Sequence, residues 1–127
     1  MPWTVSFHDA FEEEFEALAE EVQDELLATA KLLEDYGPAL RRPHADTLNG
    51  SGYANMKELR FKAADGVWRV AFAFDPKREA ILLVAGDKSG VSEDKFYKRL
   101  LKKADKRYGE HLESSKKASL SSRKKDQ

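Results

Sequence analysis

The chain has 127 residues, a formal net charge of −1 and no cysteine, which excludes a disulfide framework, a cysteine nucleophile and a cysteine-based zinc site. A chain of this length forms one domain that buries a core without disulfides or metal. Its start lacks the basic and apolar regions of a signal peptide, and no apolar run is long enough for a membrane span. We therefore expect a cytoplasmic protein that does not bind membranes.

Charge is divided unevenly along the chain. Residues 1–36 hold eleven acidic side chains and one basic, whereas residues 37–127 hold twenty-one basic and twelve acidic side chains. If the first helices pack on one side of a sheet, the molecule is an electrostatic dipole whose positive side attracts a polyanion. Alternatively, the acidic residues are simply the solvated faces of two helices.

The first third of the chain predicts a strand and two helices. Apolar and polar residues alternate over residues 3–7, which indicates a short strand. His8 or Asp9 can cap the helix that follows, and apolar residues then recur at helical spacing as far as Tyr36. A break in the apolar phase near residues 19–21 favours two helices in a hairpin, although one bent helix also fits.

The helical pattern stops at two residues with special backbone preferences. Gly37 tolerates a left-handed cap, and Pro38 cannot continue a helix. Residues 38–54 contain several turn formers, among them two prolines and two glycines, and we predict that they are irregular.

Three strands are predicted next. Residues 56–63 alternate in character, the Asp65-Gly66 pair favours a hairpin turn, and residues 67–74 alternate again. Asp75-Pro76 ends the second strand because proline lacks the N–H group that a sheet requires. The continuous apolar run at 81–85 is typical of a strand covered on both faces.

A last helix and a basic tail complete the chain. Ser92 is a plausible N-cap, and four residues at helical spacing predict a packed stripe: Phe96, Leu100, Ala104 and Tyr108. Residues 114–127 are rich in serine and lysine and have almost nothing to bury, so we predict a disordered basic tail after a single domain at 1–113. The predicted fold class is α+β: strand, helix, helix, three antiparallel strands and helix, with a small sheet packed against the N-terminal helical hairpin.

Three cations in the predicted sheet are candidate anion ligands. If residues 56–63 and 67–74 pair through the hairpin turn, Arg60 and Arg69 are roughly cross-strand neighbours within reach of one anion. Lys88 follows the third strand in a short polar loop. The alternative is that these residues are solvent-facing charges on an antiparallel sheet.

Six motifs occur in order along residues 2–112: Tyr36-Gly37-Pro38, Leu48 to Tyr53, Glu58-Leu59-Arg60, Trp68-Arg69, Ile81 to Val84 and Asp87-Lys88. This ordered set resembles the RelE/HigB superfamily of type II toxin–antitoxin ribonucleases, in particular its phage-derived HigB-like branch. The resemblance implies a RelE-like fold and an mRNA-cleaving, ribosome-associated toxin. It also implies a small helix-turn-helix antitoxin as partner and no cofactor.

Metal-independent RNA cleavage requires cations near the phosphate and groups that transfer protons. Arg60 and Arg69 suit the first role, and Lys88 suits either. Tyr97 and His111 are candidates for proton transfer, although Tyr97 also fits a helix-surface residue and His111 a solvated residue near the helix end. We expect four lysines to contact the RNA backbone: Lys57, Lys62, Lys95 and Lys98. The three histidines are scattered along the sequence, so no metal site is expected.

Two other functions fit the same pattern. One is a ParE-like toxin, which shares the fold and acts on DNA gyrase without cleaving RNA. The other is a non-catalytic relative that only binds RNA or its antitoxin.

Overall fold

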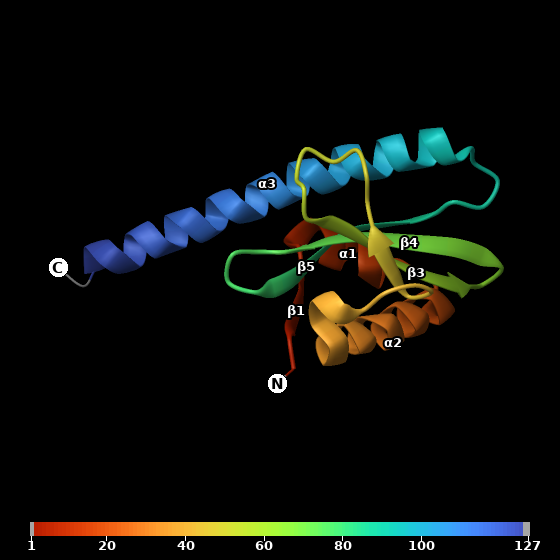
Figure 1. Cartoon of the computed structure of the whole chain (residues 1–127), viewed down its shortest axis with the longest axis horizontal. Coiled ribbons are helices and arrows are strands. Elements are labelled where there is room, and N and C mark those ends of the chain that lie inside the picture. The colour runs from red at the N-terminus through yellow and green to blue at the C-terminus, as the bar shows by residue number, and fades with distance from the viewer. Residues whose placement is uncertain (1, 126–127) are drawn as a thin grey trace.

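The computed structural model of the chain describes residues 2–125, with side chains placed as far as Lys117. The strands are β1 (Thr4–Phe7), β2 (Ala45–Thr47), β3 (Met56–Ala63), β4 (Gly66–Phe74) and β5 (Glu79–Asp87). The helices are α1 (Asp9–Glu16), α2 (Glu20–Tyr36) and α3 (Glu93–Lys125), with a short 3-10 helix, η1, at Gly37–Ala39. This architecture confirms the predicted α+β class (Figure 1).

The strands form one sheet in the order β1-β5-β4-β3-β2, in which β1 is parallel to β5 and the other pairs are antiparallel. Strand β5 lies inside the sheet, and its residues from Ala80 to Val84 are buried. The prediction of a strand covered on both faces is therefore confirmed for residues 81–84, whereas Ala85 is half-buried and β5 itself runs from Glu79 to Asp87.

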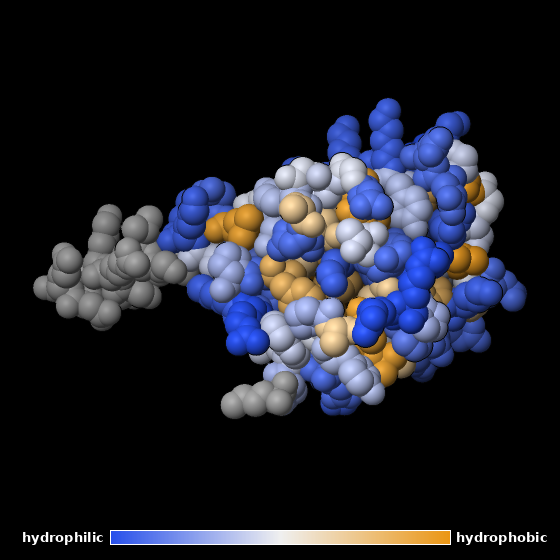
Figure 2. Space-filling model, viewed as in Figure 1, coloured by the Kyte–Doolittle hydropathy of each residue, from blue (hydrophilic) through white to orange (hydrophobic). Residues whose placement is uncertain are grey.

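Helices cover both faces of the sheet and create two core layers (Figure 1). On one face, α1 and α2 bury Phe11, Leu26 and Leu33 against residues that include Leu59, Val70, Phe72 and Leu82. On the other face, α3 buries the predicted stripe, Phe96, Leu100, Ala104 and Tyr108, against Met56, Ala71, Ala73 and Leu83. The side of the molecule seen in Figure 2 is mostly hydrophilic, with apolar residues in small separate patches.

The N-terminal helices form the hairpin that the break in apolar phase indicated, since α1 ends at Glu16 and α2 begins at Glu20. The cap of α1 is His8, whose Nδ1 accepts a hydrogen bond from the backbone N–H of Ala10 at 3.1 Å. Gly37 ends α2 with a φ of 54°, and a side chain there would collide with the indole of Trp3.

The hairpin between β3 and β4 turns one residue earlier than predicted. Ala64 and Asp65 occupy the two central positions with φ of 50° and 61°, the combination that a type I′ turn requires. Gly66 instead pairs with Ala63 as the first residue of β4, where a Cβ atom would lie only 2.7 Å from the Asp87 carboxylate. Glycine is therefore required at this position by space rather than by φ.

Two predictions about secondary structure were wrong. Residues 38–54, predicted as irregular, contain η1 and strand β2, which is only three residues long and therefore leaves no periodic pattern. The tail predicted as disordered continues α3 as far as Lys125, because extending a formed helix is much easier than nucleating one. Residues 126–127 of that tail lie outside the described residues.

Figure 1 shows the C-terminal part of α3 projecting beyond the rest of the domain. The proposed domain boundary after residue 113 remains a prediction. Within the described residues, no helix combines the length and the apolar character that crossing a membrane requires.

Candidate functional site

Arg60 and Arg69, predicted as approximate cross-strand neighbours, are directly paired residues of β3 and β4. Both side chains lie on the face of the sheet that α3 covers, where a buried carboxylate, Glu58, separates them. Arg60 Nη1 donates to Glu58 Oε2 at 2.8 Å, and Arg69 Nε lies 3.9 Å from Glu58 Oε1. Glu58 is 3% exposed and Arg69 is 5% exposed. Two like charges thus share one buried counter-ion, which makes their close approach tolerable.

Tyr97 of α3 completes this group, which we call the Glu58 cluster: Glu58, Arg60, Arg69 and Tyr97. The Tyr97 hydroxyl donates to Glu58 Oε1 at 2.9 Å and accepts from Arg69 Nε at 3.3 Å. Burial, followed by the hydrogen bond to the Glu58 carboxylate, raises the pKa of Tyr97 above its ordinary value. The hydroxyl therefore carries its proton at neutral pH.

Arg60 and Arg69 differ in solvent exposure. The Arg60 side chain is 22% exposed, so an incoming anion reaches it first. Arg69 donates through Nη1 to the carbonyl of Trp68 at 2.9 Å and through Nε to Tyr97. Among the described residues, its other guanidinium N–H groups have no hydrogen-bond partner. Arg69 is also one of the residues that line the cleft described below.

Lys88 directly follows β5, and its backbone N–H donates to the carbonyl of Val67, two residues before Arg69, at 2.8 Å. Its Nζ is 2.8 Å from Oε1 of Glu93, an exposed side chain at the start of α3. The hydrogen bond and charge of Lys88 lower the pKa of Glu93, and the charges of Arg69 and Arg60 add to this effect. One exposed carboxylate therefore lies within electrostatic reach of all three predicted cations.

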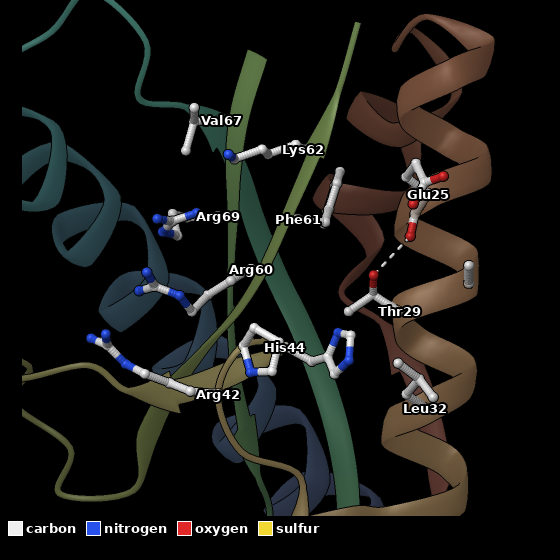
Figure 3. Close-up of a pocket in the computed structure, with 12 residues that line it drawn as sticks. Glu25, Thr29, Leu32, Arg42, His44, Arg60, Phe61, Lys62, Val67 and Arg69 are labelled. Atoms are coloured by element: carbon white, nitrogen blue, oxygen red, sulfur yellow. Dashed lines mark hydrogen bonds between the residues drawn. The ribbon is translucent and has the colours of Figure 1, made fainter. Parts of the chain in front are cut away.

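An open cleft of about 890 Å³ extends from Arg60 and Arg69 to the α2 side of β3. Figure 3 shows the guanidinium groups of Arg42, Arg60 and Arg69 on one side of β3, and Phe61 and the His44 imidazole on the side that faces α2. Arg42 is exposed and pairs with Asp46 at 2.8 Å. The hydrogen bond from Arg42 lowers the pKa of Asp46.

His111, a predicted proton donor, lies elsewhere. Its Nε2 is 2.8 Å from Oδ2 of Asp75, and its ring stacks on Tyr108. Asp75 directly follows β4, six residues beyond Arg69. This separation along a strand amounts to about 20 Å. The structure does not bring His111 to the Glu58 cluster, so its expected part in catalysis has no geometric support.

The four predicted RNA-contacting lysines are also divided. Lys62 lines the cleft, and Lys95 and Lys98 are exposed on the first turns of α3. Lys57 lies two residues before Leu59 in β3 and therefore shares its face, the α2 side, which is opposite to that of Arg60.

The sequence analysis missed Glu58, Arg42 and His44 as site residues. Glu58 could have been found from the two-residue period, since it shares a strand face with Arg60 two positions later. Arg42 and His44 belong to a basic loop whose partner strand is too short to predict. Among the described residues, no three His, Asp or Glu side chains converge as metal ligands.

Comparison with known proteins agrees with this fold. Two solved structures resemble the chain, and at their low identity they support the fold alone. One is a mutant of Escherichia coli toxin RelE in the free state, with a TM-score of 0.58, 12% identity and coverage of 80% of this chain and 95% of that one. The other is the archaeal RelE–RelB complex from Pyrococcus horikoshii, with a TM-score of 0.52, 20% identity and coverage of 72% and 100%.

Sequence relatives are more similar. The candidate toxin HigB2 of Mycobacterium tuberculosis is 43% identical over 96 residues, which are 75% of this chain and 47% of that protein. The candidate toxin HigB3 of the same organism is 47% identical over 76 residues, 60% of this chain and 65% of that protein. The match thus spans between about half and two thirds of these relatives' length.

A family description matches most of the domain. Residues 13–109 match the family described as phage derived protein Gp49-like (DUF891), and this range contains the whole Glu58 cluster. The resemblance to a phage-derived, HigB-like branch is therefore confirmed, and the chain belongs to the phage-derived Gp49-like family, with HigB-type proteins among its relatives.

Proposed function

We propose that this chain is the toxin of a type II toxin–antitoxin pair and that it cleaves mRNA, in association with the ribosome, without a metal ion. The relatives named as HigB toxins and the RelE-like fold support the toxin assignment. The observation that carries the nuclease assignment is the Glu58 cluster: paired arginines held beside a protonated tyrosine at the edge of an open cleft.

The reaction is an internal transesterification. The ribose 2′-oxygen forms a bond to phosphorus while the P–O5′ bond breaks, which leaves a 2′,3′-cyclic phosphate and a 5′-hydroxyl. Arg60 and Arg69 bind the phosphoryl oxygens, where negative charge develops in the transition state. Preorganised guanidinium groups suit this role because they remain charged at every working pH.

Two proton transfers accompany the bond changes. The 2′-hydroxyl passes its proton to the Tyr97 oxygen while Tyr97 passes its own to Glu58 Oε1, to which it is already hydrogen bonded at 2.9 Å. The ammonium group of Lys88, released from Glu93, donates a proton to the departing O5′. Each transfer of this kind contributes about 10²–10⁴ in rate.

The partner is a small antitoxin, as the complex between the related-fold protein RelE and RelB supports. It holds the toxin inactive until it is removed.

The test is cleavage of end-labelled mRNA by purified protein, alone and with ribosomes, followed by analysis of the product ends. We expect 2′,3′-cyclic phosphate and 5′-hydroxyl ends, and a loss of about a hundredfold or more in Tyr97→Phe. Lys88→Arg keeps the positive charge but removes the group that protonates the departing O5′, so its cleavage of ordinary RNA should be slow. A 5′-thio leaving group departs without protonation, so cleavage of that substrate should recover.

Two results would contradict the proposal. Loss of DNA supercoiling in expressing cells without loss of mRNA would indicate a gyrase toxin. Growth arrest that survives in both Tyr97→Phe and Arg60→Ala would show that toxicity does not depend on the cluster.

A further inference from the structure

The cleft beside the Glu58 cluster extends around a free strand edge. Strand β2 pairs with β3 only from Lys57 to Leu59, and one further hydrogen bond joins the Arg60 N–H to the His44 carbonyl at 2.8 Å. In the part of the chain that the structure describes, no strand covers residues 61–63 on that side. The edge is therefore open to a ligand.

The two sides of this edge differ in chemistry. One side presents the guanidinium groups of Arg42, Arg60 and Arg69 (Figure 3). The other presents a narrow space between β3 and α2 lined by Phe61, His44, Leu32, Thr29 and Glu25. A charged phosphate suits the first side, and a flat, partly apolar group suits the second.

We propose that one nucleotide of the RNA substrate crosses the β3 edge, with its phosphate on the arginines and its base in the space between β3 and α2. This inference rests on the proposed function and names the subsite that reads the base. The volume of the whole cleft, both sides of the β3 edge included, is about 890 Å³ and lies within the range of ligand sites in proteins. Charge complementarity favours a polyanion over a neutral or basic peptide here, and the flat space beside the arginines suits the base of a nucleic acid.

The base stacks on aromatic rings of this subsite. His44 is exposed, and Phe61 is half-buried against the ring of Trp68, with centroids 6.4 Å apart and an interplanar angle of 6°. Proteins hold unpaired RNA bases by stacking them on such rings, because every base has a flat π-face. Stacking secures the base without identifying it.

Glu25 provides the discrimination. It is an exposed residue of α2 with no ion pair among the described side chains, and it lines the same space. An ionised carboxylate accepts hydrogen bonds and donates none. Adenine, cytosine and guanine offer an amino group to it, whereas uracil has no amino group and its single N3–H is flanked by two carbonyl oxygens that repel a carboxylate. The subsite therefore prefers a base with an exocyclic amino group and disfavours uracil.

The experiment compares wild type, Glu25→Gln and His44→Ala, with Glu21→Gln as the matched control. Glu21 is an exposed carboxylate of the same helix outside the cleft. Each protein is incubated with RNA of random sequence, and ribosomes are added if cleavage depends on them. The ends of the cleaved RNA are then sequenced. Binding of short A-only and U-only oligonucleotides is measured in parallel by fluorescence anisotropy.

We expect wild type and Glu21→Gln to disfavour uracil at one fixed position next to the cut. Glu25→Gln should reduce that discrimination about fivefold or more, in cleavage and in the A-to-U binding ratio. His44→Ala should weaken binding of all oligonucleotides by about fivefold or more with their ranking unchanged.

If wild type and Glu25→Gln show the same base preference next to the cut, the proposed base subsite is wrong, even if RNA is cleaved. Cleavage that is absent while the A-to-U binding ratio still depends on Glu25 would instead contradict the proposed function and leave the subsite supported. If both variants bind RNA like wild type but lose affinity for the antitoxin, the cleft is a protein-docking site and the inference is wrong.

Discussion

Arg60 and Arg69 stand directly opposite each other on β3 and β4, and Glu58 is the carboxylate that both guanidinium groups approach. Like charges in paired positions of a sheet destabilise it unless a counter-charge lies between them. Since Glu58 and Arg69 are almost fully buried, each also needs the other to offset its own desolvation. The cluster is thus stabilised by the mutual compensation of its charges.

The first prediction concerns Arg69→Ala. Activity on RNA should fall by about a hundredfold or more, because one charge-stabilising donor is lost. Stability should fall as well, by roughly 1–3 kcal/mol, because the buried Glu58 carboxylate loses one of its two cationic neighbours and the Tyr97 hydroxyl loses a hydrogen-bond donor. Cleavage assays and urea unfolding measure the two effects.

The double variant Glu58→Gln with Arg69→Ala separates these effects. Removing the buried charge should restore much of the stability while activity stays low. Full toxicity of a folded Arg69→Ala protein would show that Arg69 has no part in the reaction.

The second prediction concerns His111. His111→Ala should leave RNA cleavage within a factor of about two, because about 20 Å of strand separates its partner Asp75 from Arg69. It should lower the free energy of unfolding by about 1.5 kcal/mol through loss of the hydrogen bond to a buried carboxylate. A hundredfold loss of cleavage activity at unchanged stability would contradict this prediction and indicate that His111 takes part in the reaction.

The third prediction is the pH dependence of stability at Asp75. Burial by itself would raise the pKa of Asp75, but hydrogen bonds from His111 and from the backbone N–H groups of Glu79 and Lys77 outweigh it and lower the pKa. Because the folded-state pKa is depressed, the stabilisation is fully present above the unfolded-state pKa of about 3.9 and is lost as pH falls through the folded value.

Urea unfolding of wild type and Asp75→Asn between pH 7 and pH 2.5 measures this effect. The wild type should be more stable at neutral pH, and the difference should shrink below about pH 4. Other carboxyl groups with lowered pKa values, such as Glu14 and Asp46, are common to both proteins and cancel. A difference that is constant across the range would contradict the charged state proposed for Asp75.

The fourth prediction concerns the antitoxin surface. The α1–α2 hairpin carries exposed carboxylates, among them Glu13, Glu16 and Glu20, that make no ion pair within the described residues. Charge complementarity there would steer the antitoxin without touching the Glu58 cluster. Reversing these three residues to Lys should slow association several-fold and weaken its salt dependence. Stopped-flow kinetics that remain unchanged would leave the cationic cleft as the binding site.

The fifth prediction concerns the end of α3. The buried stripe of this helix ends at Tyr108, and Lys116 and Lys117 are exposed. Truncation after Glu113 should therefore change the melting temperature little. It should also lower the salt dependence of RNA binding, by about 0.7 in log–log slope for each phosphate group that the shortened protein no longer neutralises. A marked drop in melting temperature would show that the terminal turns pack on another part of the chain.

The sequence by itself determined the elements that depend on local patterns. The α1–α2 hairpin followed from a break in helical phase, β3 and β4 from alternation, and the packed face of α3 from a four-residue stripe. The approximate nearness of Arg60 and Arg69 could also be predicted from a tight hairpin, whereas their exact pairing depends on the turn at Ala64-Asp65, one residue earlier than predicted.

Only the tertiary structure decided which groups complete the site. Glu58 looked like a solvent-facing strand residue until α3 covered that face and brought Tyr97 to it. His111 lies on the same helix as Tyr97, and the 1.5 Å rise per residue carries it about 21 Å further along the axis, to Asp75. Local periodicity fixes which face of an element a residue occupies, whereas the partner across that face is set by packing between segments far apart in the chain.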